Sequence, residues 1–192
     1  MPYLTNMSFR IKRFKRPVAA LALMLALAAP AAAQEQDLDD LFGALKTAEE
    51  PAASAIEQRI WEEWSKSGSP AMDLLLERGR EAMEEGDMTR AIEHFTALID
   101  HAPDFAEGYN ARATAYFQAG LYGPSLEDIR QVLARNPRHF GALSGLGLIL
   151  EEIGETKGAL DAYRAVEELY PAREGLGETI LRLERDVSGD TI

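Results

Sequence analysis

The sequence predicts an all-α solenoid of antiparallel helix pairs, and three observations lead to this fold class. The first is a 34-residue period in which prolines and glycines recur, at Pro103, Pro137 and Pro171 and at Gly86, Gly120 and Gly154. The second is the helical spacing of apolar residues within each period. The third is an amphipathic segment on each side of the periodic region, because repeat arrays need caps over their terminal apolar faces.

Four further columns of the same period each keep one physical character, alternately small and large. They are Gly79, Ala113 and Gly147; Ala82, Tyr116 and Leu150; Ala91, Ser125 and Ala159; and Phe95, Ile129 and Tyr163. Each unit divides into two helices, because its central glycine interrupts the helical pattern and its proline ends the second helix. The small first-column residues are expected where helices cross, since larger side chains would push the backbones apart.

These columns resemble the tetratricopeptide repeat (TPR) family, which has small and large residues in the first helix, Ala and an aromatic in the second, and a terminal Pro. Three units match within residues 71–173, namely 72–105, 106–139 and 140–173, a little over half of the chain. The resemblance implies a right-handed superhelical α-solenoid. It also implies that partners bind the concave surface, which the first helix of each unit lines.

Residues 1–33 have the pattern of a secretory signal peptide. Five basic residues precede an apolar run over residues 18–29, and three alanines follow it; the basic residues are Arg10, Lys12, Arg13, Lys15 and Arg16. About 12 apolar residues are too few for a membrane-spanning helix, which needs roughly 20. We therefore expect cleavage near Ala33-Gln34 and a periplasmic location in a bacterium with two membranes. Met1 and Met7 are both candidates for the start.

The charge and the absence of cysteine exclude several partners. The chain has 20 basic and 32 acidic residues, and losing the five basic residues of the signal peptide lowers its net charge from -12 to -17. Such a chain repels nucleic acid and anionic lipid. The acidic side chains either attract a basic partner or are simply solvated on the helix surfaces. Without cysteine there is no disulfide and no lipid-modified cysteine, and no membrane span is expected after cleavage.

The flanking segments predict further helices. Residues 34–70 predict a hairpin with two apolar stripes, one at Leu38, Leu41, Phe42 and Leu45, the other at Ile56, Ile60, Trp61 and Trp64. This hairpin is either separate or a degenerate fourth repeat that caps the first unit. Residues 174–192 predict a capping helix with Leu176, Ile180, Leu183 and Val187 on one face, followed by a disordered tail from residue 188.

No motif predicts catalysis, a cofactor or a metal site, so we expect a non-enzymatic protein. His94, His101 and His139 lack a third ligand at a suitable spacing and are interpreted as surface or turn residues. The segment 145–147 lacks the third glycine of a dinucleotide loop and lies in a helical pattern. Paired acidic residues are too numerous for any pair to mark an active site.

The predicted partner-binding surface lies on the first helices, opposite the small crossing residues. It comprises Leu76, Arg80, Met83, Asn110, Thr114, Phe117, Ser144, Leu148 and Glu151. Some family members grip a peptide carboxylate through lysines and asparagines, but only Arg80 and Asn110 stand where such a clamp would lie. The mixed surface better suits the apolar side of an extended or helical segment. Phe117 fits the groove and the core equally well, and Arg112 is expected to pair with a neighbouring acid.

Three functions fit these observations. The leading hypothesis is a non-catalytic protein–protein interaction module or adaptor of the bacterial cell envelope, whose partner is another protein or peptide segment. The second is an accessory subunit of an envelope enzyme complex, in which Trp61 and Trp64 line part of a pocket. The third is a self-associating structural protein, a homo-oligomer in which these tryptophans or the C-terminal stripe pair across a two-fold axis. Repeat folds serve many tasks, so the sequence names neither partner nor pathway.

Overall fold

The computed structural model describes residues 29–189, with side-chain environments from Asp37 onward. Most of the predicted signal peptide, and the chain after Gly189, lie outside the described residues. The chain divides into two units, Met1–Gln36 and Asp37–Ile192, and the helix pairs lie in the second. The predicted cleavage point between Ala33 and Gln34 falls within the helix that begins at Ala29.

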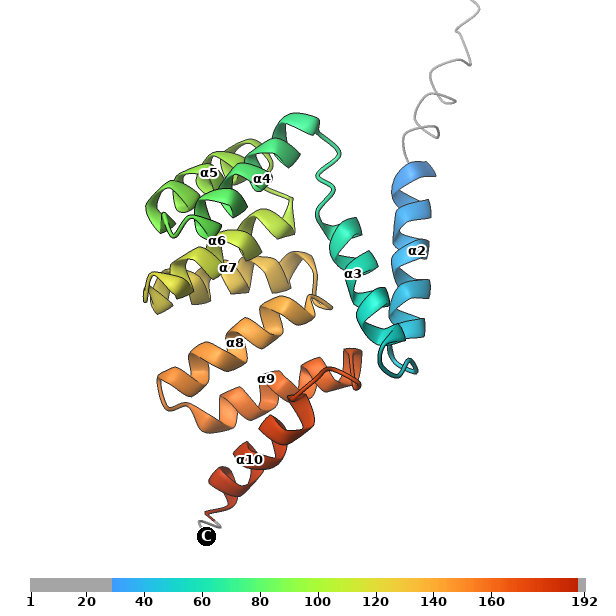
Figure 1. Ribbon diagram of the computed structural model, residues 1–192, viewed down its shortest axis with the longest axis vertical. Helices are drawn as coiled ribbons and strands as arrows, with labels where there is room; N and C mark the ends of the chain where they lie inside the picture. Colours follow the sequence, from blue (N-terminus) through green and yellow to red (C-terminus); the bar gives the residue numbers. More distant parts are fainter. Residues whose placement is uncertain (1–28, 190–192) are drawn as a thin grey trace, which may run out of the picture. The chain divides into compact units, whose positions relative to one another are not determined.

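The predicted all-α fold class is confirmed, since residues 29–189 form nine helices and no strand (Figure 1). The helices are α2 Ala29–Leu45, α3 Ala52–Trp64, α4 Pro70–Glu84, α5 Met88–His101, α6 Ala106–Gln118, α7 Tyr122–Arg135, α8 Phe140–Glu152, α9 Thr156–Leu169 and α10 Leu176–Ser188. The pairs α4/α5, α6/α7 and α8/α9 are the three repeat units and stack in chain order. Pro70 is the first residue of α4, where proline is well tolerated.

Glycine and proline set the length of each helix. At the end of α4, Gly86 takes a left-handed φ of 80°, and the amide of Asp87 donates to the carbonyl of Ala82 at 2.9 Å. This closure satisfies carbonyls that the helix end would leave without partners, and glycine adopts it without strain. The second helix of each unit ends two residues before its proline, as α5 does at His101, because the residue before a proline, here Ala102, avoids helical angles.

The small residues lie where the sequence places them, at close helix crossings. A Cβ added to Gly79 would stand 2.2 Å from Cε1 of Phe95, and one added to Gly147 would stand 2.7 Å from Cζ of Tyr163. Each pair joins the first and second helices of one unit. The 34-residue period therefore brings a missing side chain against an aromatic ring in both the first and the third unit.

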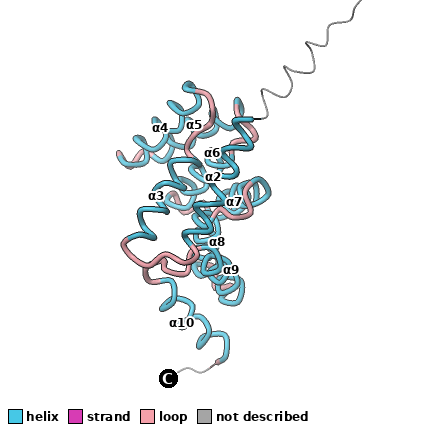
Figure 2. The backbone as a smooth tube through the Cα atoms, turned by 90° about the vertical axis from the view of Figure 1, so that its right-hand side faces the viewer, coloured by secondary structure: helices cyan, strands magenta, loops and turns pink. Residues whose placement is uncertain are grey.

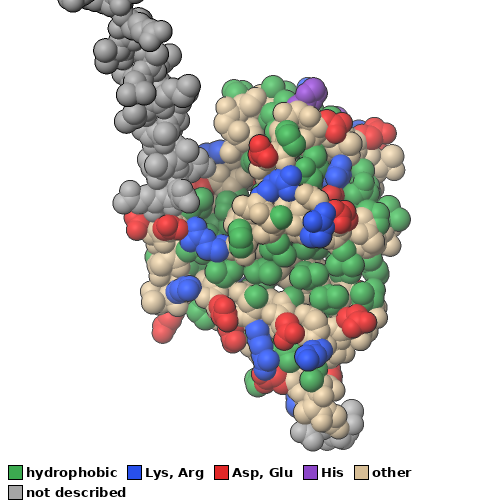
Figure 3. Space-filling view, turned by 180° about the vertical axis from the view of Figure 1, so that it is seen from behind, with side chains coloured by type: hydrophobic (Ala, Val, Ile, Leu, Met, Phe, Trp, Pro, Cys, Tyr) green, Lys and Arg blue, Asp and Glu red, His purple; other side chains and the backbone are tan. Residues whose placement is uncertain are grey.

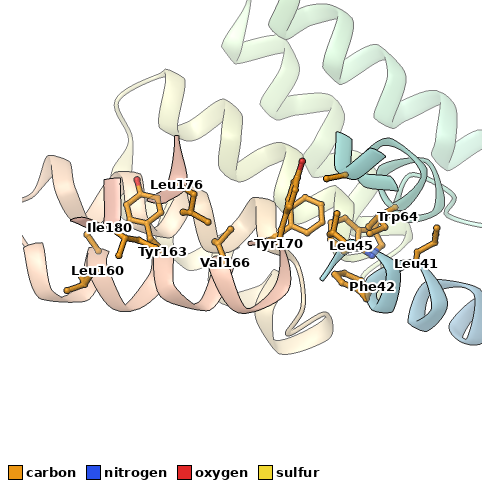
Figure 4. Close-up of a cluster of buried hydrophobic side chains, with 14 of the residues drawn as sticks. Leu41, Phe42, Leu45, Trp64, Leu160, Tyr163, Val166, Tyr170, Leu176 and Ile180 are labelled. Atoms are coloured by element: carbon orange, nitrogen blue, oxygen red, sulfur yellow. The ribbon is translucent and has the colours of Figure 1, made fainter. Parts of the chain in front are cut away.

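The buried apolar residues form three clusters. One lies among α4, α5 and α6 around Phe95 and Leu98, and a second joins the second unit to α8 around Ile129 and Val132. The largest extends from the N-terminal hairpin through the third unit to α10. Figure 4 shows its labelled side chains in a row from Leu160 to Leu41. Full burial of each large side chain contributes about 1.5–3 kcal/mol.

The N-terminal hairpin packs beside the third unit, so it does not cap the first unit as a fourth repeat would. Figures 1 and 2 both place α3 alongside the ends of the repeat helices. The rings of Trp64 and Phe140 lie 4.9 Å apart, and the Tyr170 hydroxyl donates to the carboxylates of Glu50 and Glu57 at 3.2 Å. The apolar stripes of the hairpin belong to one buried cluster with Phe140, at the start of α8, and Tyr170, just after α9.

Both tryptophans are packed within the chain. The edge of the Trp61 ring meets Phe140 with 5.6 Å between ring centroids, and a Cβ added to Gly141 would stand 2.5 Å from Trp61. Trp64 is buried. Burial makes Trp64 unavailable for pairing across a two-fold axis, whereas Trp61 is half-buried, and self-association stays a prediction.

The last helix, α10, buries Leu176, Ile180 and Leu183 against the third unit, as a cap does. Val187 remains exposed although it belongs to the predicted stripe. Ser188 is the last residue of α10, so the prediction that disorder begins at residue 188 was wrong for that residue. Among the helices of the described chain, none combines the length and the apolar character that crossing a membrane requires.

Candidate functional site

A hollow of about 300 Å³ opens between the first helices of the second and third units. We call it the central hollow. Its lining comes from α6, α7, α8 and the turn after α9, and comprises Asn110, Ala113, Thr114, Phe117, Gln118, Ser125, Ile129, Gly141, Ala142, Ser144, Gly145, Leu148, Ile149 and Arg173. Five of the nine predicted site residues come together here, on the helices where sequence analysis placed them.

The apolar side chains of the central hollow differ in how far they are exposed to solvent. Leu148 is 47% exposed although it is a large aliphatic residue. Phe117 is half-buried and stacks on Tyr122, with 5.7 Å between ring centroids and 26° between planes. Phe117 therefore belongs both to the hollow and to the packing behind it. An apolar group entering the hollow would cover Leu148 and remove its surface from water.

The polar part of the hollow is held in place by local hydrogen bonds. The Thr114 hydroxyl donates to the carbonyl of Asn110 at 3.0 Å, and the Ser144 hydroxyl donates to the carbonyl of Phe140 at 2.7 Å. Both hydroxyl oxygens can still accept a hydrogen bond. The Asn110 amide donates to Glu107 at 3.1 Å, which fixes its orientation. The hollow thus offers acceptors to peptide N–H groups beside an apolar surface.

The other four predicted residues are engaged elsewhere. Leu76 is 2% exposed within the cluster around Phe95, so it is unavailable to a partner. Met83 packs against the same cluster. The guanidinium of Arg80 donates to Glu107 at 2.6 Å and to Ser65 at 3.1 Å. Glu151 accepts from Arg182 of the capping helix at 2.5 Å. Sequence spacing gave the correct helices but could not show which side chains the packing already uses.

A buried polar network around Glu107 was missed by sequence reasoning. Glu107 and His139 are 3% and 1% exposed, and His139 Nε2 lies 3.2 Å from the Glu107 carboxylate. The backbone amide of Ala142 donates to His139 Nδ1 at 3.1 Å, which assigns the ring proton to Nε2. Arg80 and Asn110 donate to the same carboxylate. This buried acid is therefore well partnered, as burial requires.

His139 was interpreted as a surface or turn residue, and the structure confirms the turn but not the surface position. It does lie in the turn before α8, where its side chain caps the helix. It is buried because the Trp64 ring stacks on it, with 4.2 Å between centroids and 16° between planes. A tryptophan 75 residues earlier in the chain leaves no local pattern around a histidine. Nothing in the sequence could distinguish Glu107 from the many surface acids.

Arg112 has the bracing role predicted for it. Its Nε and Nη2 atoms donate to the two carboxylate oxygens of Asp128 at 2.7 and 2.8 Å, and Nη1 donates to Thr96 at 3.1 Å. The hydrogen bonds to Asp128 raise the pKa of the Arg112 guanidinium. This ion pair joins α6 to α7. Arg112 is thus committed to holding the second unit together.

The surface of the protein combines apolar and charged side chains. Figure 3 shows apolar side chains gathered across the middle of one face, with acidic and basic side chains among and around them. Among the described residues, no three histidine or acidic side chains come close enough together to hold a metal ion. The central hollow offers an apolar surface and hydrogen-bonding groups, which suits non-covalent recognition.

The stacked helix pairs define an α-solenoid, and comparisons with known proteins identify its family. The tetratricopeptide repeat family model matches residues 76–124 and 124–174, just over half of the chain. A TPR repeat-containing protein of Rhizobium etli is 38% identical over 157 residues, covering 81% of this chain and 77% of that protein. The chain therefore belongs to the tetratricopeptide repeat family.

Other similar proteins include a co-chaperone and a peptide-bound TPR domain. A heat-shock protein cognate co-chaperone of Aspergillus fumigatus is 30% identical over 121 residues, covering 62% of this chain but only 36% of that protein. The solved first TPR domain of RPAP3, bound to the HSP90 peptide SRMEEVD, has the same fold, with a TM-score of 0.58 and 22% identity over 61% of this chain and 93% of that one. None of these three relatives is named as an enzyme. Membership of this family supports a protein-interaction module.

Proposed function

We propose that this protein is a non-catalytic interaction module or adaptor of the bacterial cell envelope, which holds a peptide or helix of another protein in the central hollow. The central hollow itself carries the proposal, because exposed Leu148 stands beside Phe117 and the acceptor oxygens of Thr114 and Ser144. An apolar patch with a few fixed polar groups is the usual form of a recognition site. The peptide bound by the similar RPAP3 domain supports the same use of the fold.

Leu148 provides a direct test, because its side chain is exposed and its loss leaves little void. Binding of a captured partner should weaken about three- to tenfold in Leu148→Ala, since covering the exposed half of a leucine contributes about half of the 1.5–3 kcal/mol of full burial, and 1.4 kcal/mol is a factor of ten. The matched control is Leu121→Ala, which is also 47% exposed but lies outside the central hollow. We expect Leu121→Ala to bind like wild type.

The measurement is affinity capture from an envelope extract of the source organism, followed by titration of each captured protein. A partner lost by Leu148→Ala and retained by Leu121→Ala would agree with the proposal. Equal retention by both variants would move the binding surface away from the central hollow. Loss by both would indicate a general effect of surface leucines.

The envelope location rests on the N-terminal pattern of residues 1–33, with its basic region, short apolar run and alanines. The test is to sequence the N-terminus of the protein isolated from its own cells. Export and cleavage predict a chain that begins at Gln34. A chain that begins at Met1 or Met7 would contradict this part of the proposal and leave the binding role untouched.

A further inference from the structure

The central hollow contains one cation that the described protein leaves unpaired. Arg173 lies in the turn between α9 and α10 and lines the hollow together with Leu148 and Ser144. Its Nη1 atom is buried and has no hydrogen-bond partner among the described residues. No carboxylate in the described chain stands within ion-pair distance of its guanidinium, although Glu174 is its neighbour in sequence.

The other partly buried arginines contrast with Arg173. Arg112 is bonded to both oxygens of Asp128, and Arg80 is bonded to Glu107. Buried side-chain donors almost always have partners, and a donor left without one destabilises the folded state. A guanidinium has a planar set of donors that fits a carboxylate. An unpaired one at the side of a recognition hollow therefore points to an anionic ligand.

The shape of the surface around Arg173 indicates which kind of carboxylate is bound. A second hollow of about 210 Å³ adjoins the first and is lined by Tyr163, Gly175 and Thr179. Ser144, Leu148 and Arg173 line both hollows, so Arg173 stands between them. A peptide that reaches Arg173 from the central hollow thus has room to continue beyond it. An acidic side chain within a segment fits this arrangement better than a chain end does.

We propose that Arg173 is a specificity-determining residue of the central hollow, which binds an Asp or Glu side chain inside a partner segment whose neighbouring apolar side chain covers Leu148. This inference rests on the proposed function of the hollow and adds the chemical class of its ligand. It also selects against basic partners at this site, although the chain as a whole is strongly acidic.

The experiment starts from a library of random 12-residue peptides that are displayed without a free carboxyl end. Those that bind the purified protein are selected. The selected peptides should contain Asp or Glu next to an apolar residue. Synthetic copies with amidated ends are then titrated against wild type, Arg173→Gln and the charge-matched control Arg78→Gln, an exposed arginine of α4 outside both hollows. We expect Arg173→Gln to weaken binding about tenfold or more and Arg78→Gln to change it less than twofold.

A double-mutant cycle tests direct pairing. Replacing the peptide acid by its amide should weaken binding to wild type about tenfold, and should have little further effect on Arg173→Gln. Arg173→Gln should keep the wild-type helix content, because its buried Nη1 has no partner to lose. Equal effects of the peptide change on both proteins would overturn the proposal, as would selected peptides that lack an acid.

Leu148→Ala separates this inference from the proposed function. Peptides that need Leu148 but tolerate Arg173→Gln would leave the binding role of the hollow in place and overturn the role of Arg173. Peptides indifferent to both changes, or no selected peptide at all, would overturn both. Each synthetic peptide is also made with a free carboxyl end: if that form binds wild type more tightly than the amidated form, and the gain is lost in Arg173→Gln, a chain end replaces the internal acid and the proposal as stated is refuted.

Discussion

Adding a single methyl group at Gly79 tests the close helix crossing of the first unit. In Gly79→Ala the new Cβ would lie 2.2 Å from Cε1 and 2.6 Å from Cδ1 and Cζ of Phe95, whereas carbon atoms in contact prefer about 3.5–4.0 Å. The Phe95 ring must therefore move by more than about 1 Å. It has nowhere to go without disturbing its cluster, because it is fully buried.

Two opposing effects set the size of the change. Alanine is better than glycine in a helix by about 1 kcal/mol, which favours the variant. Overpacking a rigid core costs about 1–3 kcal/mol and sometimes more, and a separation this short lies at the upper end. We expect the free energy of unfolding to fall by about 1–2 kcal/mol. Gly43→Ala is the matched control, since a Cβ there meets no atom within 4 Å, and it should gain up to about 1 kcal/mol.

The assay is urea unfolding followed by circular dichroism at 222 nm, which reports all helices. Trp61 and Trp64 fluorescence reports the third unit separately, so coincident transitions would show that the chain unfolds as one. The cost of Gly79→Ala should shrink in a Phe95→Leu background, which removes the ring. A Gly79→Ala protein as stable as Gly43→Ala, or an unchanged cost without the ring, would refute this account of the crossing.

Two further predictions concern buried polar groups. Burial, together with the carboxylate of Glu57, raises the pKa of Tyr170 to about 12, so the folded state resists its ionisation. The stabilisation is retained below pH 10, the usual pKa of tyrosine, and is lost as the pH rises toward 12. In urea titrations, wild type should lose about 1 kcal/mol of unfolding free energy relative to Tyr170→Phe between pH 9 and 11. Parallel pH profiles of the two proteins would contradict this. Asp128→Ala leaves Arg112 without its partner and should lower the free energy of unfolding by about 2–4 kcal/mol in the same assay, whereas a loss below 1 kcal/mol would show that the pair contributes little.

The repeat units follow from local chemistry in the sequence. Gly86 and its counterparts permit left-handed turns, Pro103 and its counterparts stop helices, and small residues face large ones across each pair. These signals act between residues less than 34 apart, so the sequence of one unit predicts its helix pair. Three units in phase then predict that the pairs stack. Helical spacing also brought five of the nine predicted partner-binding residues to the lining of one hollow.

The N-terminal hairpin shows where such reasoning stops. Its apolar stripes predicted two helices but not their place, since an apolar stripe with Trp64 could cover either end of a solenoid. Only the tertiary structure brings Tyr170 to Glu50, 120 residues earlier, and stacks Trp64 on His139. Contacts over such distances have no period, and they depend on shape complementarity that a list of residues does not contain.

The sequence by itself determined the helix pairs, their order and the helices that line the hollow. The tertiary structure alone decided which side chains are still available there. Arg80 and Arg173 are equally basic in the sequence, yet the first is bonded to Glu107 and the second is unpaired beside Leu148. The reason is physical: a side chain's propensity acts locally, but its freedom to bind depends on every group that folding brings within hydrogen-bond distance.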